Sequence, residues 1–158
     1  MMTLLFFHSL FRWLVLISLL SSIFIAYRGY YQQLPFSKSA NALRHWTATI
    51  AHIQLMLGIL VYSKSQVVSY FWKHFSQAVH QLDTLFFSLI HLVLMLVAIV
   101  LLTIGSALAK RRESDREKFK TMLVWFTLFR AFSCIEQTTI AATRRSFYHP
   151  KLYSCFEL

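Results

Sequence analysis

Histidine is the residue type in this chain whose positions most strongly suggest chemistry. Four of the seven histidines lie in or beside apolar stretches: His8 in "HSLFRW", His45 and His52 in "RHWTATIAHIQ", and His91 in "LFFSLIHLVLMLVAIV". An imidazole in hydrocarbon must find a partner, because no water is available there. Imidazoles from two helices of a membrane bundle are also the usual ligands of b-type haem. These residues therefore predict either a haem site or a set of hydrogen bonds between helices.

The composition places the histidines in an integral membrane protein. The 158 residues are 57% hydrophobic and 14% charged, with 3 glycines and 2 prolines, which differs from the balance of a soluble domain. A helix needs about 20 apolar residues to cross a hydrocarbon layer of roughly 30 Å. We therefore expect an all-α integral membrane four-helix bundle. Residues 1–158 would form a single transmembrane domain with helices at about 4–27, 43–63, 84–108 and 120–141 and an irregular tail, 142–158.

The 16 basic and 6 acidic residues lie mainly between these apolar runs. Arg28, Lys38 and Arg44 fall between the first two helices, and "KRRESDREKFK" at 110–120 joins the last two. Short connections rich in Lys and Arg stay on the cytoplasmic side of a membrane. The sequence therefore predicts a multi-pass protein of the cell inner membrane with both termini outside, in the periplasm. The lipid bilayer is its expected partner, and this distribution of charge argues against nucleic acid.

The connection between the second and third runs has the pattern of an amphipathic helix. Its apolar residues recur at helical spacing with polar residues between them, and it carries Tyr70 and Trp72. Such helices lie where headgroups meet hydrocarbon, and aromatic rings are common at that level. We expect an interfacial segment between helices 2 and 3.

The fourth run is the least apolar of the four. It contains Arg130, and a central arginine costs about 2.5–3.5 kcal/mol on insertion scales. If this helix crosses the membrane, its polar residues must face the bundle. If it does not cross, the helix lies at the membrane surface.

Helical rise predicts that two of the histidines meet. His52 lies ten residues before the outer end of the second helix, roughly 15 Å, and His91 lies seven residues into the third helix, roughly 10 Å. We therefore predict that His52 and His91 are the axial ligands of one haem b iron in the outer half of the membrane. His45 lies about 10 Å deeper, opposite residues 100–103, which include no haem ligand, so one haem is the maximum.

His8 and Arg12 are four residues apart on one face of the first helix. A guanidinium binds a carboxylate through two hydrogen bonds, so Arg12 could hold one haem propionate while His8 holds the other or acts as an alternative ligand. Alternatively, Arg12 extends to the outer headgroups and His8 is interfacial. For His52 and His91 the alternative is hydrogen bonding between helices, with three candidate partners: Gln54, Ser88 and Thr84.

Three stretches resemble blocks of small bacterial four-helix membrane proteins labelled cytochrome-b-like: "HSLFRWLVL", "AHIQLMLGILVY" and "IHLVLMLVAIVLLTIGSALAK". The resemblance covers about residues 4–125. It implies a four-helix bundle in a cell membrane and assigns four residues to the family's own polar positions: His8, Arg12, His52 and His91. The chain departs from the family at Ile90, where an acidic residue is expected, and in "FSCIEQTTIAATRRS", where the family has a Pro-Trp-rich helix end.

Two functions are compatible with these features. The first is a b-type cytochrome-like protein that transfers electrons through one bis-histidine haem. It would act as a redox subunit with no catalytic centre of its own, alongside other respiratory or redox membrane subunits. The second is a haem-free accessory or assembly protein whose histidines tie helices together. The sequence contains no phosphate-binding loop, zinc-protease motif or C-x-x-C pair, which excludes the chemistries that depend on them.

Overall fold

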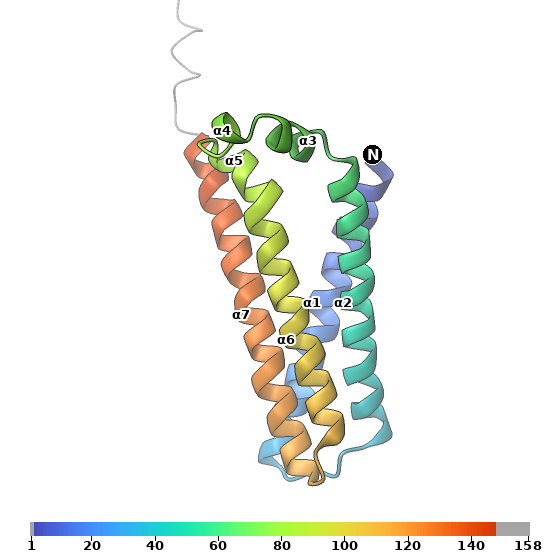
Figure 1. Ribbon diagram of the computed structural model, residues 1–158. Helices are drawn as coiled ribbons and strands as arrows, with labels where there is room; N and C mark the ends of the chain where they lie inside the picture. The colour runs from blue at the N-terminus through green and yellow to red at the C-terminus, as the bar shows by residue number, and fades with distance from the viewer. Residues whose placement is uncertain (1, 148–158) are drawn as a thin grey trace, which may run out of the picture.

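The computed structural model describes residues 2–147, with side chains described for residues 2–135 and 138. Within this part of the chain all regular structure is helical, and the long helices lie side by side (Figure 1). They are α1 (Met2–Tyr31), α2 (Lys38–Lys64), α6 (His91–Arg111) and α7 (Asp115–Phe147). The predicted all-α bundle is confirmed. Helix α7 extends beyond the predicted end at 141, and the rest of the predicted tail, 148–158, lies outside the described residues.

Three described stretches are long and apolar enough to cross a membrane: Met2–Tyr31, Lys38–Lys64 and Leu82–Arg111. The last of these consists of α5 (Leu82–Leu85), a π-helical turn η1 (Phe86–Ile90) and α6. Helix α7 is not among them; it begins with a run of charged residues, "DREKFK", and carries Arg130 further along. These stretches indicate a multi-pass protein in a lipid bilayer.

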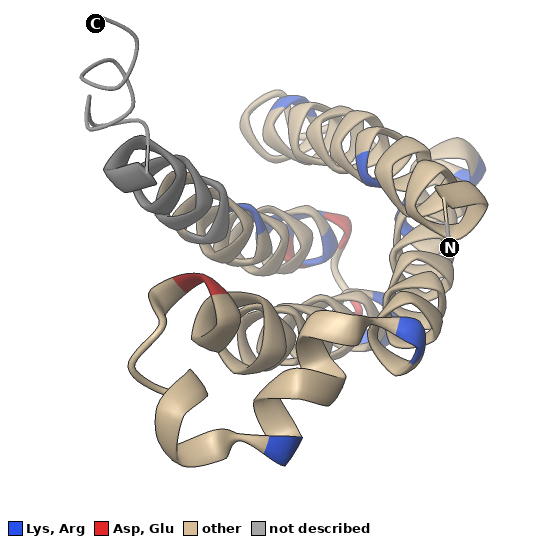
Figure 2. Cartoon of the chain, turned by 90° about the horizontal axis from the view of Figure 1, so that it is seen from above, with Lys and Arg blue, Asp and Glu red and all other residues tan. Residues whose placement is uncertain are grey.

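The long helices form a ring when viewed along their axes (Figure 2). Helix α1 contacts α2 and α7, and α6 contacts the same two helices. Helices α1 and α6 are therefore diagonal to one another. Each helix runs antiparallel to its neighbours in the ring, as in an up-down-up-down bundle.

The core combines aromatic residues of α7 with small residues of the other helices. Phe119, Met122, Phe126 and Phe129 recur every three or four residues along α7, and none is more than 4% exposed. They form one cluster with buried alanines of α1, α2 and α6: Ala26, Ala40, Ala51, Ala98 and Ala109. Small residues at these positions allow the helices to approach closely.

Short helices cover the end of the bundle where α2 finishes (Figure 1). They are α3 (Gln66–Lys73), α4 (Phe75–Ala78) and α5. Val68 and Phe71 of α3 are buried, whereas Trp72 is exposed and donates from Nε1 to the Tyr62 hydroxyl at 3.0 Å. The short segment predicted between the second and third long apolar helices is therefore present.

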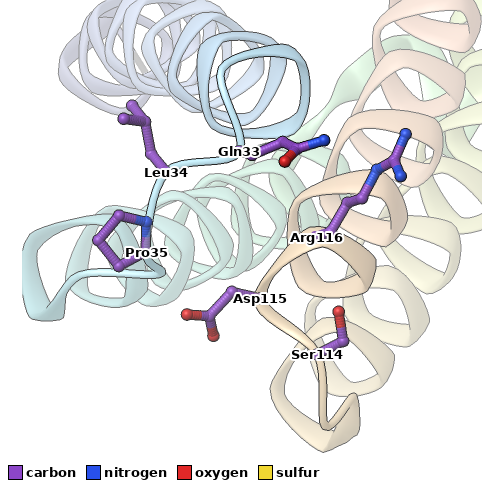
Figure 3. A pocket seen from close by; sticks show the side chains of 6 residues that line it. All are labelled: Gln33, Leu34, Pro35, Ser114, Asp115 and Arg116. Carbon is purple, nitrogen blue, oxygen red and sulfur yellow. The ribbon is translucent and has the colours of Figure 1, made fainter.

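The connection 32–37, between α1 and α2, is fastened to the start of α7 by Asp115. One carboxylate oxygen of Asp115 accepts a hydrogen bond from the Phe36 amide at 3.0 Å, and the other accepts one from Lys118 Nζ at 2.9 Å. Figure 3 shows Asp115 at an open pocket of about 440 Å³ between the two segments. The hydrogen bond from Phe36, followed by the hydrogen bond and charge of Lys118, holds the pKa of Asp115 below its usual range.

Replacing Asp115 with asparagine is expected to loosen this connection at neutral pH. The lowered pKa means that the carboxylate stabilises the contact at neutral pH and that this contribution is lost as the pH falls through the pKa of the folded protein. Hydrogen exchange of residues 32–37 should therefore be faster in Asp115→Asn at pH 7, and the difference should shrink in acid. Glu117→Gln is the control, because Glu117 is exposed and makes no hydrogen bond within the described residues. Equal effects of the two variants would contradict the assignment.

Candidate functional site

His52 is held by hydrogen bonds at both of its ring nitrogens. Its Nδ1 lies 2.6 Å from the Ala48 carbonyl oxygen, one turn earlier in α2, and its Nε2 lies 3.1 Å from Thr103 Oγ1 of α6. Because a carbonyl can only accept, Nδ1 is the donor to Ala48, whereas the single proton of the Thr103 hydroxyl goes to the Ile99 carbonyl oxygen at 2.7 Å. Both ring nitrogens of His52 therefore contact oxygen atoms, and the Nε2 contact reaches from α2 to α6.

His91 is the first residue of α6 and lies far from His52. Thr103, the partner of His52, follows His91 by twelve residues, which is roughly 18 Å along a helix axis. Two imidazoles that share an iron need nitrogens roughly 4 Å apart across the metal. The structure does not bring the predicted ligand pair together, and these two residues do not fit a shared haem in this arrangement.

The predicted depths of His52 and His91 are wrong because α2 and α6 do not pack at the levels expected from counting residues from the helix ends. The Tyr62 hydroxyl, near the end of α2, donates to the Ser88 carbonyl oxygen at 3.1 Å. Counting residues from the expected helix ends had placed this end of α2 opposite Thr84. Near this end the offset is four residues, roughly 6 Å, and at His52 it is nine residues, because counting from the ends puts His52 opposite residue 94 and the structure pairs it with Thr103. His52, instead of His45, lies opposite residues 100–103.

His8 contacts α2 at a position that the sequence had not paired with it. Gln54 Nε2 donates to the His8 carbonyl oxygen at 3.0 Å and lies 3.4 Å from His8 Nε2. The His8 ring also lies beside Gly58, where a Cβ would be 3.4 Å from His8 Cε1. The side chain of Arg12 is exposed and makes no hydrogen bond or ion pair within the described residues.

Arg44 is a buried polar residue that the sequence placed in a connection. It belongs to α2 and is only 5% exposed. Its Nη1 donates to the Ser106 carbonyl oxygen at 2.7 Å and to Ser106 Oγ at 2.5 Å, while Nη2 and Nε donate to Asn41 Oδ1 at 2.9 and 3.2 Å. The guanidinium therefore joins α2 to α6. The spacing of Asn41 and Arg44, one helical turn apart, was the available signal.

Two further polar features lie inside the bundle. Ser22 of α1 and Thr47 of α2 are fully buried, and their hydroxyl oxygens are 2.7 Å apart. Arg130 of α7 is half-buried, and its Nη1 is buried without a hydrogen-bond partner in the described part of the chain. The arginine of the least apolar helix is therefore turned at least partly into the bundle.

Hydrogen bonds of these polar residues connect the long helices. No group of three or more His, Cys, Asp or Glu side chains in this part of the chain could hold a metal ion. The polar residues are instead distributed along the bundle, each mostly paired with a neighbouring helix. No known protein family, curated protein or solved structure matches the chain.

Proposed function

We propose that this chain is a haem-free accessory or assembly protein of the cell inner membrane. The observation that carries the proposal is the environment of His52, whose ring nitrogens contact Ala48 and Thr103, and Thr103 follows His91 by twelve residues along α6. The Arg44 and Gln54 contacts support the same view, since they also join one long helix to another. Intramembrane polar residues serve here to fix helix packing.

We further propose that α7 is a fourth membrane span and that both termini lie outside. Support comes from the apolar face of α7, which is buried against α1, α2 and α6, and from the partial burial of Arg130. A helix with polar residues can cross a membrane when those residues face the bundle. The basic connections at 28–38 and 110–120 would then face the cytoplasm.

Two measurements test the haem-free assignment. The first is a reduced-minus-oxidised absorption spectrum of the full chain, purified after expression with haem supplied, and we expect no Soret or α-band change. The second is a double-mutant cycle of His52→Phe and Thr103→Val, followed by thermal unfolding in detergent. Hydrogen bonds between membrane helices average about 0.6 kcal/mol and reach about 1.7 kcal/mol, so we expect coupling of this size.

The cytochrome-like function would replace this proposal under a specific result. Haem bound in stoichiometric amount to the wild type and to Thr103→Val, but lost from both His52→Ala and His91→Ala, would establish the axial pair. Such a result would require α2 and α6 to pack in a different register. The accessory role itself predicts that the chain, solubilised from native membranes, migrates with a different membrane protein in stoichiometric amount. Migration of the 18.6 kDa chain alone or only with itself would contradict that role.

A further inference from the structure

A second open pocket, of about 260 Å³, lies at the same end of the bundle as the 32–37 connection. Its polar lining comes from three long helices: α2 supplies Lys38 and Asn41, α6 supplies Lys110, and α7 supplies Lys118. Phe36 and Ser37 of the connection complete the lining, which includes no acidic residue. A pocket with three lysines and no carboxylate in its wall attracts an anion.

Two of the three lysines are available to bind a ligand. Lys38 and Lys110 make no ion pair or hydrogen bond through their side chains within the described residues. Lys118 differs, because its Nζ contacts Asp115 Oδ1 at 2.9 Å and lies over the Phe36 ring at 5.6 Å from the centroid. The Asp115 carboxylate offsets the charge of Lys118, so Lys38 and Lys110 carry the attraction.

The other polar groups of the pocket are the Asn41 amide and the Ser37 hydroxyl. Asn41 uses its Oδ1 to accept from Arg44 Nε and Nη2, which leaves its Nδ2 as the free end of the amide. Ser37 caps α2 by accepting from the Ala40 amide at 3.2 Å. The first turn of α2 contains no acidic residue that would compensate the positive end of the helix dipole. Lysines, an amide donor and a helix start together match the oxygens of a phosphate group.

We propose that this pocket binds the phosphate of an anionic phospholipid headgroup. Helix α2 begins at Lys38 and α6 ends at Arg111, and both belong to stretches able to cross a membrane. The pocket therefore lies where these helices leave the hydrocarbon, at the level of the headgroups. Basic pockets between helices at this level bind anionic headgroups, and each nearby Lys or Arg adds to the attraction. A free phosphate has the same chemistry but does not share this position.

The test uses the purified full chain and two charge-matched double variants. Lys38→Gln with Lys110→Gln removes the two available lysines, whereas Lys64→Gln with Lys73→Gln removes two lysines from the opposite end of the bundle. Phosphatidylglycerol binding is measured by native mass spectrometry, with phosphatidylcholine as the neutral lipid and inorganic phosphate as the competitor. Thermal unfolding confirms that each variant is folded.

We expect wild type and the Lys64/Lys73 variant to retain phosphatidylglycerol in preference to phosphatidylcholine. The Lys38/Lys110 variant should bind phosphatidylglycerol about thirtyfold more weakly, as expected for two lysines near a charged headgroup. Equal losses in the two variants would mean general charge attraction and would overturn the site. Equal retention of both lipids, or displacement of phosphatidylglycerol by millimolar inorganic phosphate, would overturn the assignment to a lipid.

Discussion

Replacing Gly105 with alanine is expected to push α7 away from α6 and to destabilise the bundle. A Cβ at Gly105 would lie 2.2 Å from the Cβ of Trp125. That atom is fixed to the α7 backbone, so the side chain cannot rotate away and the helices themselves must separate. Overpacking of this kind costs typically 1–3 kcal/mol and occasionally more, as an order-of-magnitude range. Thermal unfolding in detergent measures the loss, and the emission of Trp125 should shift to the red as its surroundings open.

Gly58→Ala is the matched control for this prediction. A Cβ at Gly58 would meet the His8 ring, at 3.4 Å from Cε1 and 3.8 Å from Nδ1, and the imidazole can move by a few tenths of an ångström. The expected change is within about 0.5 kcal/mol. If Gly105→Ala is as stable as the wild type, or if Gly58→Ala loses as much stability, then α6 and α7 do not cross at Gly105.

The fold could be predicted from the sequence because a membrane imposes its thickness on the chain. The apolar runs that became α1, α2 and the stretch ending with α6 are recognisable from their length alone. The face of α7 that packs on the core can also be identified from the spacing of Phe119, Met122, Phe126 and Phe129. The helix ends were less predictable, since α1 and α2 each begin or end several residues beyond the apolar run.

The candidate site could not be predicted because it depends on the register between helices. Counting from helix ends placed His52 beside His91. The contacts of α2 with Ser88 of η1 and with Thr103 and Ser106 of α6 place the two helices at different levels from that count. In the structure Thr103, twelve residues further along the chain than His91, is the partner of His52. Residue types therefore identified which side chains need partners, whereas the partners themselves follow from packing.

The same limit explains Arg44, which sequence reasoning treated as one of several cytoplasmic charges. Its burial depends on Ser106, a small residue of α6 that leaves room for the guanidinium and supplies two acceptors. Nothing in the sequence around Arg44 identifies a residue 62 positions away as its partner. A substitution that keeps the charge but changes the geometry therefore distinguishes a buried connector from a basic residue that only sets topology.

Replacing Arg44 with lysine is expected to destabilise the bundle although the charge is retained. Arg44 uses three nitrogens to reach Asn41 on one side and Ser106 on the other. A lysine has one ammonium group and cannot reproduce this fork, so acceptors on one side lose their donor. A hydrogen bond to a charged group is worth about 1.5–3 kcal/mol, and we expect a loss of stability in this range by thermal unfolding in detergent.

Arg28→Lys provides the control for the retained charge. Arg28 is exposed near the same end of the bundle, with one side-chain hydrogen bond, to Gln32 Oε1 at 3.4 Å, and a contact with the Phe24 ring. Its replacement should change stability by no more than about 0.5 kcal/mol. Ser106→Ala, alone and combined with Arg44→Lys, then isolates the contact between α2 and α6, because the two losses should be less than additive if the residues act together. Strict additivity, or equal losses in Arg44→Lys and Arg28→Lys, would show that Arg44 does not join the helices through Ser106.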